Sequence, residues 1–172
     1  MRTVLSKNLG EIFPYKELID AFKNDPARNY SFDDEFIDGL IESEKDSDNA
    51  DYVLHLLYSN LDFSNQTFHQ DHLHPATIFT DEEKFNKYIP SEIQEFAKKS
   101  ENWNSVANLQ LLIGKKNESK NKKFLKDWVL EENKTNKDLF LSNGISLEIK
   151  DFKEFIIDRK ANIKKHIKSI VE

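Results

Sequence analysis

Apolar residues recur every three to four positions along most of the chain, which is the spacing of amphipathic helices. In residues 1–62 this pattern predicts short helices, one of which begins near Ser31 and is followed by an acidic loop at 42–51. A longer amphipathic helix is predicted at 151–171, and its inward-facing residues are Phe152, Phe155, Ile156, Ile163, Ile167 and Ile170. The pattern therefore predicts a mainly α-helical fold.

Two short segments interrupt the helical period. Residues 66–75, QTFHQDHLHP, have no helical spacing and end on proline, which predicts a strand that runs into a loop. Residues 108–114, NLQLLIG, alternate into an apolar run closed by glycine and predict a second strand. We expect the strands to pair antiparallel, with a helix that starts near Asn117 packed across both. The expected fold is thus mainly α with a small two-stranded antiparallel sheet.

The chain between and after the strands is again expected to be helical. Capping patterns at Thr80 and Ser91 predict two short helices within 76–106, and helical spacing resumes at 115–130. Since 172 residues suit one domain and no repeat or linker divides them, we expect a single domain. Its parts are a helical lead-in at 1–62, a core at 63–130 with the helical insertion at 76–106, and C-terminal helices at 131–172.

The composition narrows the environment in which the protein is expected to act. The sequence has no cysteine, which excludes disulfides, thiolate zinc sites and cysteine nucleophiles and suits a reducing cytoplasm. No apolar run approaches the ~18 residues that a bilayer span needs, and charged residues near the N-terminus precede any signal-like stretch. We therefore expect a soluble cytoplasmic protein with no membrane partner.

Charge is divided unevenly along the chain. The net charge of −6 combines 7 basic and 18 acidic residues in 1–85 with 18 basic and 13 acidic residues in 86–172. Six lysines fall within twelve residues of the basic half: Lys115, Lys116, Lys120, Lys122, Lys123 and Lys126. A lysine-rich helix face is often only solvated, but this one lies beside unusual polar residues, which favours contact with phosphate groups.

These unusual polar residues lie on the two predicted strands and the helix that follows them. They are Asp71, His72, His74, Asn108, Asn117 and Asn121. Hydrolysis of a phosphodiester needs a base that deprotonates water and a cation that stabilises charge on the phosphate. His72 suits the base, and Asp71 and Asn117 offer oxygen ligands for Mg²⁺ or another divalent cation such as Mn²⁺. Asn108 is expected to hydrogen-bond across the loop and hold His72 in orientation.

Three segments that contain these residues resemble the HNH, or ββα-metal, nuclease motif. They are QDHLHP at 70–75, ANLQLL at 107–112 and NESKNKKF at 117–124. More narrowly, they resemble the C-terminal nuclease domain of GmrSD-type restriction endonucleases, whose pattern is an acid-His-aliphatic-x-Pro strand, a (G)NLxLL strand and an asparagine-containing helix start. The resemblance is strongest over 52–130, and Trp103 and Arg159 also resemble family positions.

The resemblance implies a ββα-metal (HNH) core embedded in a helical domain. By position, Asp71 and Asn117 would be metal ligands, His72 the general base and Asn108 the residue that braces the loop. The residues expected to contact nucleic acid are Lys115, Lys116, Lys120, Asn121, Lys122 and Lys123. The implied activity is that of a metal-dependent HNH endonuclease that cuts DNA in restriction or phage defence.

The chain departs from the family pattern at three points. Ala107 stands where the family usually has Gly, and His74 occupies a variable position, so it inherits no role. Nothing in the sequence resembles the N-terminal nucleotide-binding domain, with its DGQQR motif, that such proteins usually carry. The chain therefore looks like the nuclease half alone, and a specificity or nucleotide-binding domain would be a separate partner.

Two other interpretations stay open. One is a non-catalytic HNH-like module that binds nucleic acid or a protein without cutting. The other is an all-helical interaction protein whose match to the motif is coincidental. Metal-dependent nicking of plasmid DNA separates the nuclease from both. DNA and RNA substrates, single- and double-strand cutting, and any oligomeric state are compatible with the sequence.

Overall fold

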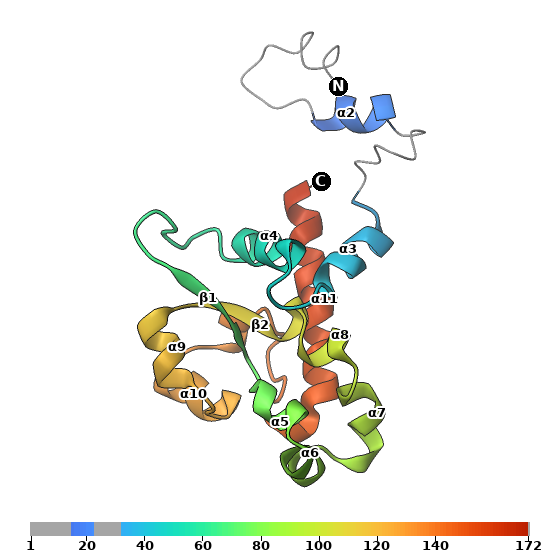
Figure 1. Cartoon of the computed structure of the whole chain (residues 1–172). Coiled ribbons are helices and arrows are strands. Elements are labelled where there is room, and N and C mark those ends of the chain that lie inside the picture. The colour runs from blue at the N-terminus through green and yellow to red at the C-terminus, as the bar shows by residue number, and fades with distance from the viewer. Residues whose placement is uncertain (1–14, 23–31, 172) are drawn as a thin grey trace. The chain divides into compact units, whose positions relative to one another are not determined.

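The computed structural model describes residues 15–22 and 32–171 (Figure 1). The chain forms two compact units, Met1–Asp34 and Glu35–Glu172, which we describe separately. The first unit contains helix α2 (Tyr15–Phe22), one of the short helices that the spacing of apolar residues predicts. The expectation of a single domain stays a prediction.

The second unit is mainly helical and contains one two-stranded antiparallel sheet, as the sequence pattern predicts. Its α-helices and strands are, in chain order, α3 (Asp34–Ile41), α4 (Asp48–Leu57), β1 (Phe68–His72), α5 (Ala76–Thr80), α6 (Glu82–Tyr88), α7 (Gln94–Ala97), α8 (Ser100–Trp103), β2 (Leu109–Ile113), α9 (Gly114–Lys120), α10 (Leu125–Glu131) and α11 (Phe152–Val171). Short 3-10 turns lie at η1 (Ser91–Ile93), η2 (Val106–Asn108), η3 (Asn136–Leu139) and η4 (Ile149–Asp151). Within the described ranges, no helix combines the length and the apolar character that a membrane crossing requires.

Strands β1 and β2 pair antiparallel, which confirms both predicted strands and their pairing. In the register, Asp71 lies opposite Gln110 and His72 lies opposite Leu109. Just beyond the ladder, the Leu73 amide donates to the Asn108 carbonyl at 2.7 Å. The strand therefore ends at His72, and a hydrogen-bonded loop follows it.

Helix α9 contacts both strands, as predicted, and lies beside the sheet in Figure 1. It begins at Gly114, three residues before Asn117, and ends at Lys120. The chain at 115–130 is helical, as predicted, but it forms two helices, because Asn121 takes a positive φ of 41° and separates α9 from α10. Asparagine visits positive φ more readily than most residues, since its short side chain bonds locally to the backbone.

The insertion at 76–106 contains four short α-helices instead of the two predicted. The capping patterns predicted at Thr80 and Ser91 are wrong. Asp81 caps α6 by accepting a hydrogen bond from the Lys84 amide at 3.1 Å, and Ser91 lies inside a 3-10 turn. Four elements of four to seven residues can follow the surface of the core more closely than two longer helices.

The acidic segment predicted as a loop contains the beginning of α4. The Ser47 hydroxyl caps this helix by accepting from the Ala50 amide at 3.2 Å. Asp48 and Asp51 stand in its first turn, where the helix dipole stabilises carboxylates. The helix start predicted near Ser31 lies outside the described residues, and α3 runs from Asp34.

Helix α11 supplies much of the buried core of the second unit. Its buried residues include Phe152, Phe155, Ile156, Ile163 and Ile167, as predicted. Ile170 is 48% exposed, so its predicted inward position is wrong, because the last turn of the helix extends beyond this core. Arg159 is fully buried and donates to four backbone carbonyls at 2.7–2.8 Å: those of Val106, Ala107, Leu109 and Leu139. Arg159 therefore fastens α11 to η2 and to the beginning of β2.

Candidate functional site

Asp71 presents the carboxylate that the sequence predicts as a metal ligand. Its Oδ2 accepts a hydrogen bond from Gln110 Nε2 at 3.0 Å, and Lys120 Nζ lies 3.0 Å from the same oxygen. The side chain of Asp71 is 11% exposed. Both protein partners therefore hold the same carboxylate oxygen, while a small part of the side chain stays accessible.

Lys120 is the main correction to the predicted site. It was expected among the lysines that contact nucleic acid, but its side chain is fully buried, so this assignment is wrong. Its ammonium pairs with Asp71, donates to the His72 carbonyl and lies 5.7 Å from the ring centroid of Trp128. The physical reason is the break at Asn121, which ends α9 with Lys120 on its sheet-facing side.

The pKa of Lys120 follows from these contacts. Burial lowers the pKa, because a desolvated ammonium is costly, and the charge and hydrogen bond of Asp71 oppose the decrease. One signal in the sequence indicates this position: Lys120 is three residues after Asn117, so the two share a helix face. By composition alone, Lys120 is one lysine of an exposed cluster. The sequence analysis therefore missed its buried ion pair with Asp71.

His72, the predicted general base, is the last residue of β1 and is partly buried. Its ring lies nearly parallel to that of Trp103, with centroids 5.9 Å apart, and its Nε2 is 3.0 Å from Asn104 Oδ1. Because a carbonyl oxygen only accepts, this contact assigns the ring proton to Nε2 and leaves Nδ1 as the basic nitrogen. No described residue forms a hydrogen bond with Nδ1.

The environment of His72 keeps its ring neutral near pH 7. Burial lowers the pKa of His72, and the nearby charges of Lys45 and Lys120 act in the same direction. The Asn104 hydrogen bond and the charge of Asp71 raise the pKa and only partly offset burial. A neutral imidazole with an available nitrogen can accept a proton from water.

Asn108 braces the loop as predicted, but it does not hold the His72 ring. Its fully buried amide accepts from the His74 amide at 3.0 Å and donates to the carbonyls of His74 at 3.0 Å and Trp103 at 2.8 Å. The orienting contact to His72 comes from Asn104, which the sequence analysis missed. Its position directly after Trp103 is the one signal that could have indicated it.

Asn117, the second predicted ligand, is the fourth residue of α9 and is partly exposed. The described residues offer its side-chain amide no hydrogen-bond partner. It shares a face with Lys120, whose ammonium reaches Asp71. A cation shared by Asp71 and Asn117 stays a prediction.

Asp71 and Asn117 carry the kind of oxygen donors that a hard divalent cation prefers. The described residues contain no group of three or more His, Cys, Asp or Glu side chains that could hold a metal. A cation here would therefore depend on oxygens from Asp71 and Asn117, with water and substrate phosphate completing its shell. Mg²⁺ tolerates such a set, since it keeps several waters and binds proteins through few ligands.

The remaining lysines lie outside this buried pair. Lys115, Lys116 and Lys122 are exposed, and Lys123 is partly exposed. Three members of the cluster form ion pairs: Lys116 with Glu132 at 2.5 Å, Lys123 with Glu131 at 2.5 Å and Lys126 with Glu148 at 2.5 Å. Lys115 and Lys122 have no ion pair with the described residues, so they are the freest charges for phosphate contact. Asn121 is also exposed, and its predicted contact with nucleic acid stays a prediction.

His74 belongs to the core and not to the site. Its ring packs edge-on against Phe152 and Phe155, with centroid distances of 5.5 and 4.6 Å. Neither ring nitrogen has a hydrogen-bond partner among the described residues. Burial, with the charges of Lys120 and Arg159, lowers the pKa of His74 to about 3, so the ring stays neutral.

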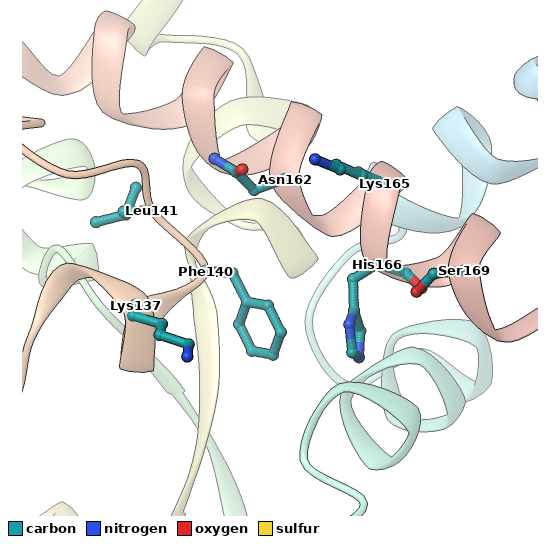
Figure 2. A pocket seen from close by; sticks show the side chains of 7 residues that line it. All are labelled: Lys137, Phe140, Leu141, Asn162, Lys165, His166 and Ser169. Carbon is teal, nitrogen blue, oxygen red and sulfur yellow. The ribbon is translucent and has the colours of Figure 1, made fainter.

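A separate cavity of about 420 Å³ lies between α11 and the segment around η3 (Figure 2). Its lining residues are Lys137, Phe140, Leu141, Asn162, Lys165, His166 and Ser169. The ring centroids of Phe140 and His166 lie 5.3 Å apart, so part of the cavity lining is aromatic. None of the predicted site residues lines this cavity, so it is not part of the candidate site.

Comparison with known proteins assigns the chain to no family. No protein-family model matches the sequence, and no curated protein is detectably similar to it. The resemblance to HNH nucleases therefore depends on the three sequence motifs.

Proposed function

We propose that this protein is a Mg²⁺-dependent endonuclease that hydrolyses phosphodiester bonds in DNA, built around a ββα-metal (HNH) core. One observation carries the proposal: a carboxylate and a histidine with an available nitrogen occupy consecutive positions at the end of a two-stranded sheet that contacts a helix. Asp71 and His72 are consecutive on β1, and Lys120 of α9 pairs with the Asp71 carboxylate and donates to the His72 backbone carbonyl. The predicted order of strand, strand and helix supports the same proposal.

His72 acts as the general base in this proposal. Its Nδ1 accepts a proton from the attacking water, while Asn104 and the Trp103 ring fix the plane of the imidazole. Asn108 fixes the loop that follows His72 and so stabilises the position of His72 at the end of β1. A base held on one side by a hydrogen bond and on the other by a ring loses little freedom when the substrate binds.

Asp71 and Asn117 are the residues that would hold the divalent cation. When bound, the cation would stabilise the charge that develops on the scissile phosphate and the leaving oxygen. Gln110 and Lys120 hold Asp71 Oδ2, so the second carboxylate oxygen would be the one available to a cation. The exposed lysines near α9 would contact backbone phosphates, which position DNA without reading its sequence. Restriction or phage defence is the proposed biological setting, and a cytoplasmic location accompanies it.

The test is metal-dependent nicking of a supercoiled plasmid. We expect wild-type protein to nick with Mg²⁺ or Mn²⁺ and not with EDTA. His72→Ala should lower the rate about 10²–10⁴-fold, since a positioned base contributes that much. Asp71→Ala should also suppress cutting, with partial recovery at high Mg²⁺.

His69→Ala is the matched control, because His69 lies on the same strand and is exposed. It should cut at the wild-type rate. Cleavage by His72→Ala at the wild-type rate, or cleavage that persists in EDTA, would contradict the proposal.

A non-cutting HNH-like binding module is the second candidate, and one contact favours it. The Lys120 ammonium already neutralises Asp71, so the buried charge is satisfied without a metal ion. This candidate predicts DNA binding, detected by gel shift, with no nicking under any metal condition.

A further inference from the structure

We infer that the site binds its divalent cation together with a nucleic-acid phosphate, because Lys120 cancels the charge of Asp71 in the free protein. The inference deepens the proposed function and rests on it. It concerns the order in which metal and substrate assemble, and it assigns Lys120 as the positioning residue that couples them.

The charge inventory of the site is the first step. Asp71 supplies one negative charge, and the Lys120 ammonium, 3.0 Å away, supplies one positive charge. Gln110, which donates to Asp71, and Asn104, which contacts the His72 ring, are neutral amides, and so is Asn117, the second proposed ligand. The second nearby ammonium, on Lys45, is paired with its own neighbour Asp46 at 2.7 Å. The free site therefore offers no net negative charge to an approaching dication.

Lys120 cannot easily leave this position, which is the second step. Its side chain is fully buried, and its ammonium is also bonded to the His72 carbonyl and placed near the Trp128 ring. Movement would take the donor from the partly buried His72 carbonyl and would leave Asp71 with only the neutral Gln110 donor, a costly change for a buried ion pair. The positive charge therefore stays beside the cation position, where repulsion opposes metal binding.

A phosphodiester would supply the missing charge, which is the third step. Its anionic oxygen can contact the cation directly, so metal and DNA each improve the binding of the other. Such coupling is reciprocal: the factor by which DNA tightens metal binding equals the factor by which metal tightens DNA binding. Lys120 would thus prevent metal uptake by the free protein while orienting Asp71 for the loaded complex.

The experiment measures Mn²⁺ affinity by isothermal titration calorimetry in a His72→Ala background, which prevents cleavage. The protein is titrated alone and with a short DNA duplex, and the duplex alone is titrated separately. We expect the duplex to tighten Mn²⁺ binding at least about tenfold. Adding Lys120→Gln should tighten binding to the DNA-free protein by a similar factor and reduce the effect of DNA, since a neighbouring positive charge is removed.

Two further variants keep the result interpretable. Lys120→Met tests the loss of charge in a second side chain of similar length, and thermal melting checks that each variant folds. Lys150→Gln, at an exposed position outside the lysine cluster, should leave Mn²⁺ affinity unchanged.

The outcomes separate this inference from the proposed function. If Lys120→Gln and Lys120→Met both fold and bind Mn²⁺ no more tightly than the background, the inference is wrong. If the background binds Mn²⁺ equally well with and without DNA, the inference is also wrong, while wild-type nicking would leave the proposed function intact. If no protein binds Mn²⁺ even with DNA, both fail.

Discussion

The second unit contains two polar regions beside the sheet that use the same residue types differently. The closed region comprises Arg159, His74 and Asn108, and the open region comprises Lys120, His72 and Asn104. Each has one buried cation, one histidine and one asparagine. In the closed region, Arg159 and Asn108 bond to backbone groups and His74 packs against phenylalanine rings. In the open region, the cation binds a carboxylate that is 11% exposed.

The comparison teaches that burial of a polar residue does not by itself indicate function. Both cations are fully buried, yet Arg159 donates four of its five N–H groups to backbone carbonyls within the core. Around Lys120, the accessible part of Asp71 and the Nδ1 of His72 remain available. The distinguishing property is an unused bonding group that a substrate or cation can reach.

The largest expected effect is a loss of folding stability when Arg159 of the closed region is replaced. Arg159→Met should lower the free energy of unfolding by on the order of 3 kcal/mol, because buried carbonyls lose their donor. Chemical denaturation measures the change, and Lys165→Met, at an exposed position of the same helix, is the control. If Arg159→Met lowers the free energy of unfolding no more than the control does, the closed region does not have the structural role assigned to it.

The second prediction concerns His74, the histidine of the closed region, at acidic pH. The pKa of His74 is about 3 in the folded protein and about 6.5 when unfolded, so between these values only the unfolded chain binds the proton. Stability should therefore fall as pH decreases below 6.5, by up to about 1.4 kcal/mol per pH unit. His74→Phe should reduce this loss between pH 7.5 and pH 5, as measured by denaturant midpoints. An unchanged difference between these pH values would show that other groups cause the loss.

The third prediction concerns Asn104 in the open region. Asn104→Ala should lower the cleavage rate about tenfold, since the His72 ring loses the contact that orients it. The Asn104 hydrogen bond raises the pKa of His72, so its removal should also move the acid limb of the pH–rate profile to lower pH. Asn143→Ala, at an exposed position, should change neither. A lower rate with an unmoved acid limb would contradict the assigned hydrogen bond.

The smallest expected effect lies at the exposed lysines. Replacing Lys115 and Lys122 with Gln should weaken DNA binding equally on all sequences and reduce the log–log salt slope by about 0.9 per lost contact. Binding titrations at several salt concentrations measure the slope. The same changes at Lys150 and Lys153, which are exposed outside this cluster, serve as controls. Equal slopes in all variants would mean that the cluster is only solvated.

The sequence by itself determined the elements that depend on local pattern. Loss of helical period located both strands, and the apolar spacing of 151–171 predicted most of the buried face of α11. The same strands carried Asp71 and His72 to the end of the sheet. Such features depend on neighbours within a few positions, which periodicity and turn residues report directly.

Only the tertiary structure decided which polar groups meet. Asn104 bonds to the His72 ring across 32 positions, and Lys120 bonds to the His72 carbonyl across 48. Asn108 and Asn104 are only four residues apart, and their different roles follow from where the chain folds back on itself. Lys120 differs from its lysine neighbours because α9 ends at it and turns it toward the sheet. Contacts between residues so far apart in the sequence depend on how the helices pack against the sheet. The local spacing of residues does not encode that packing.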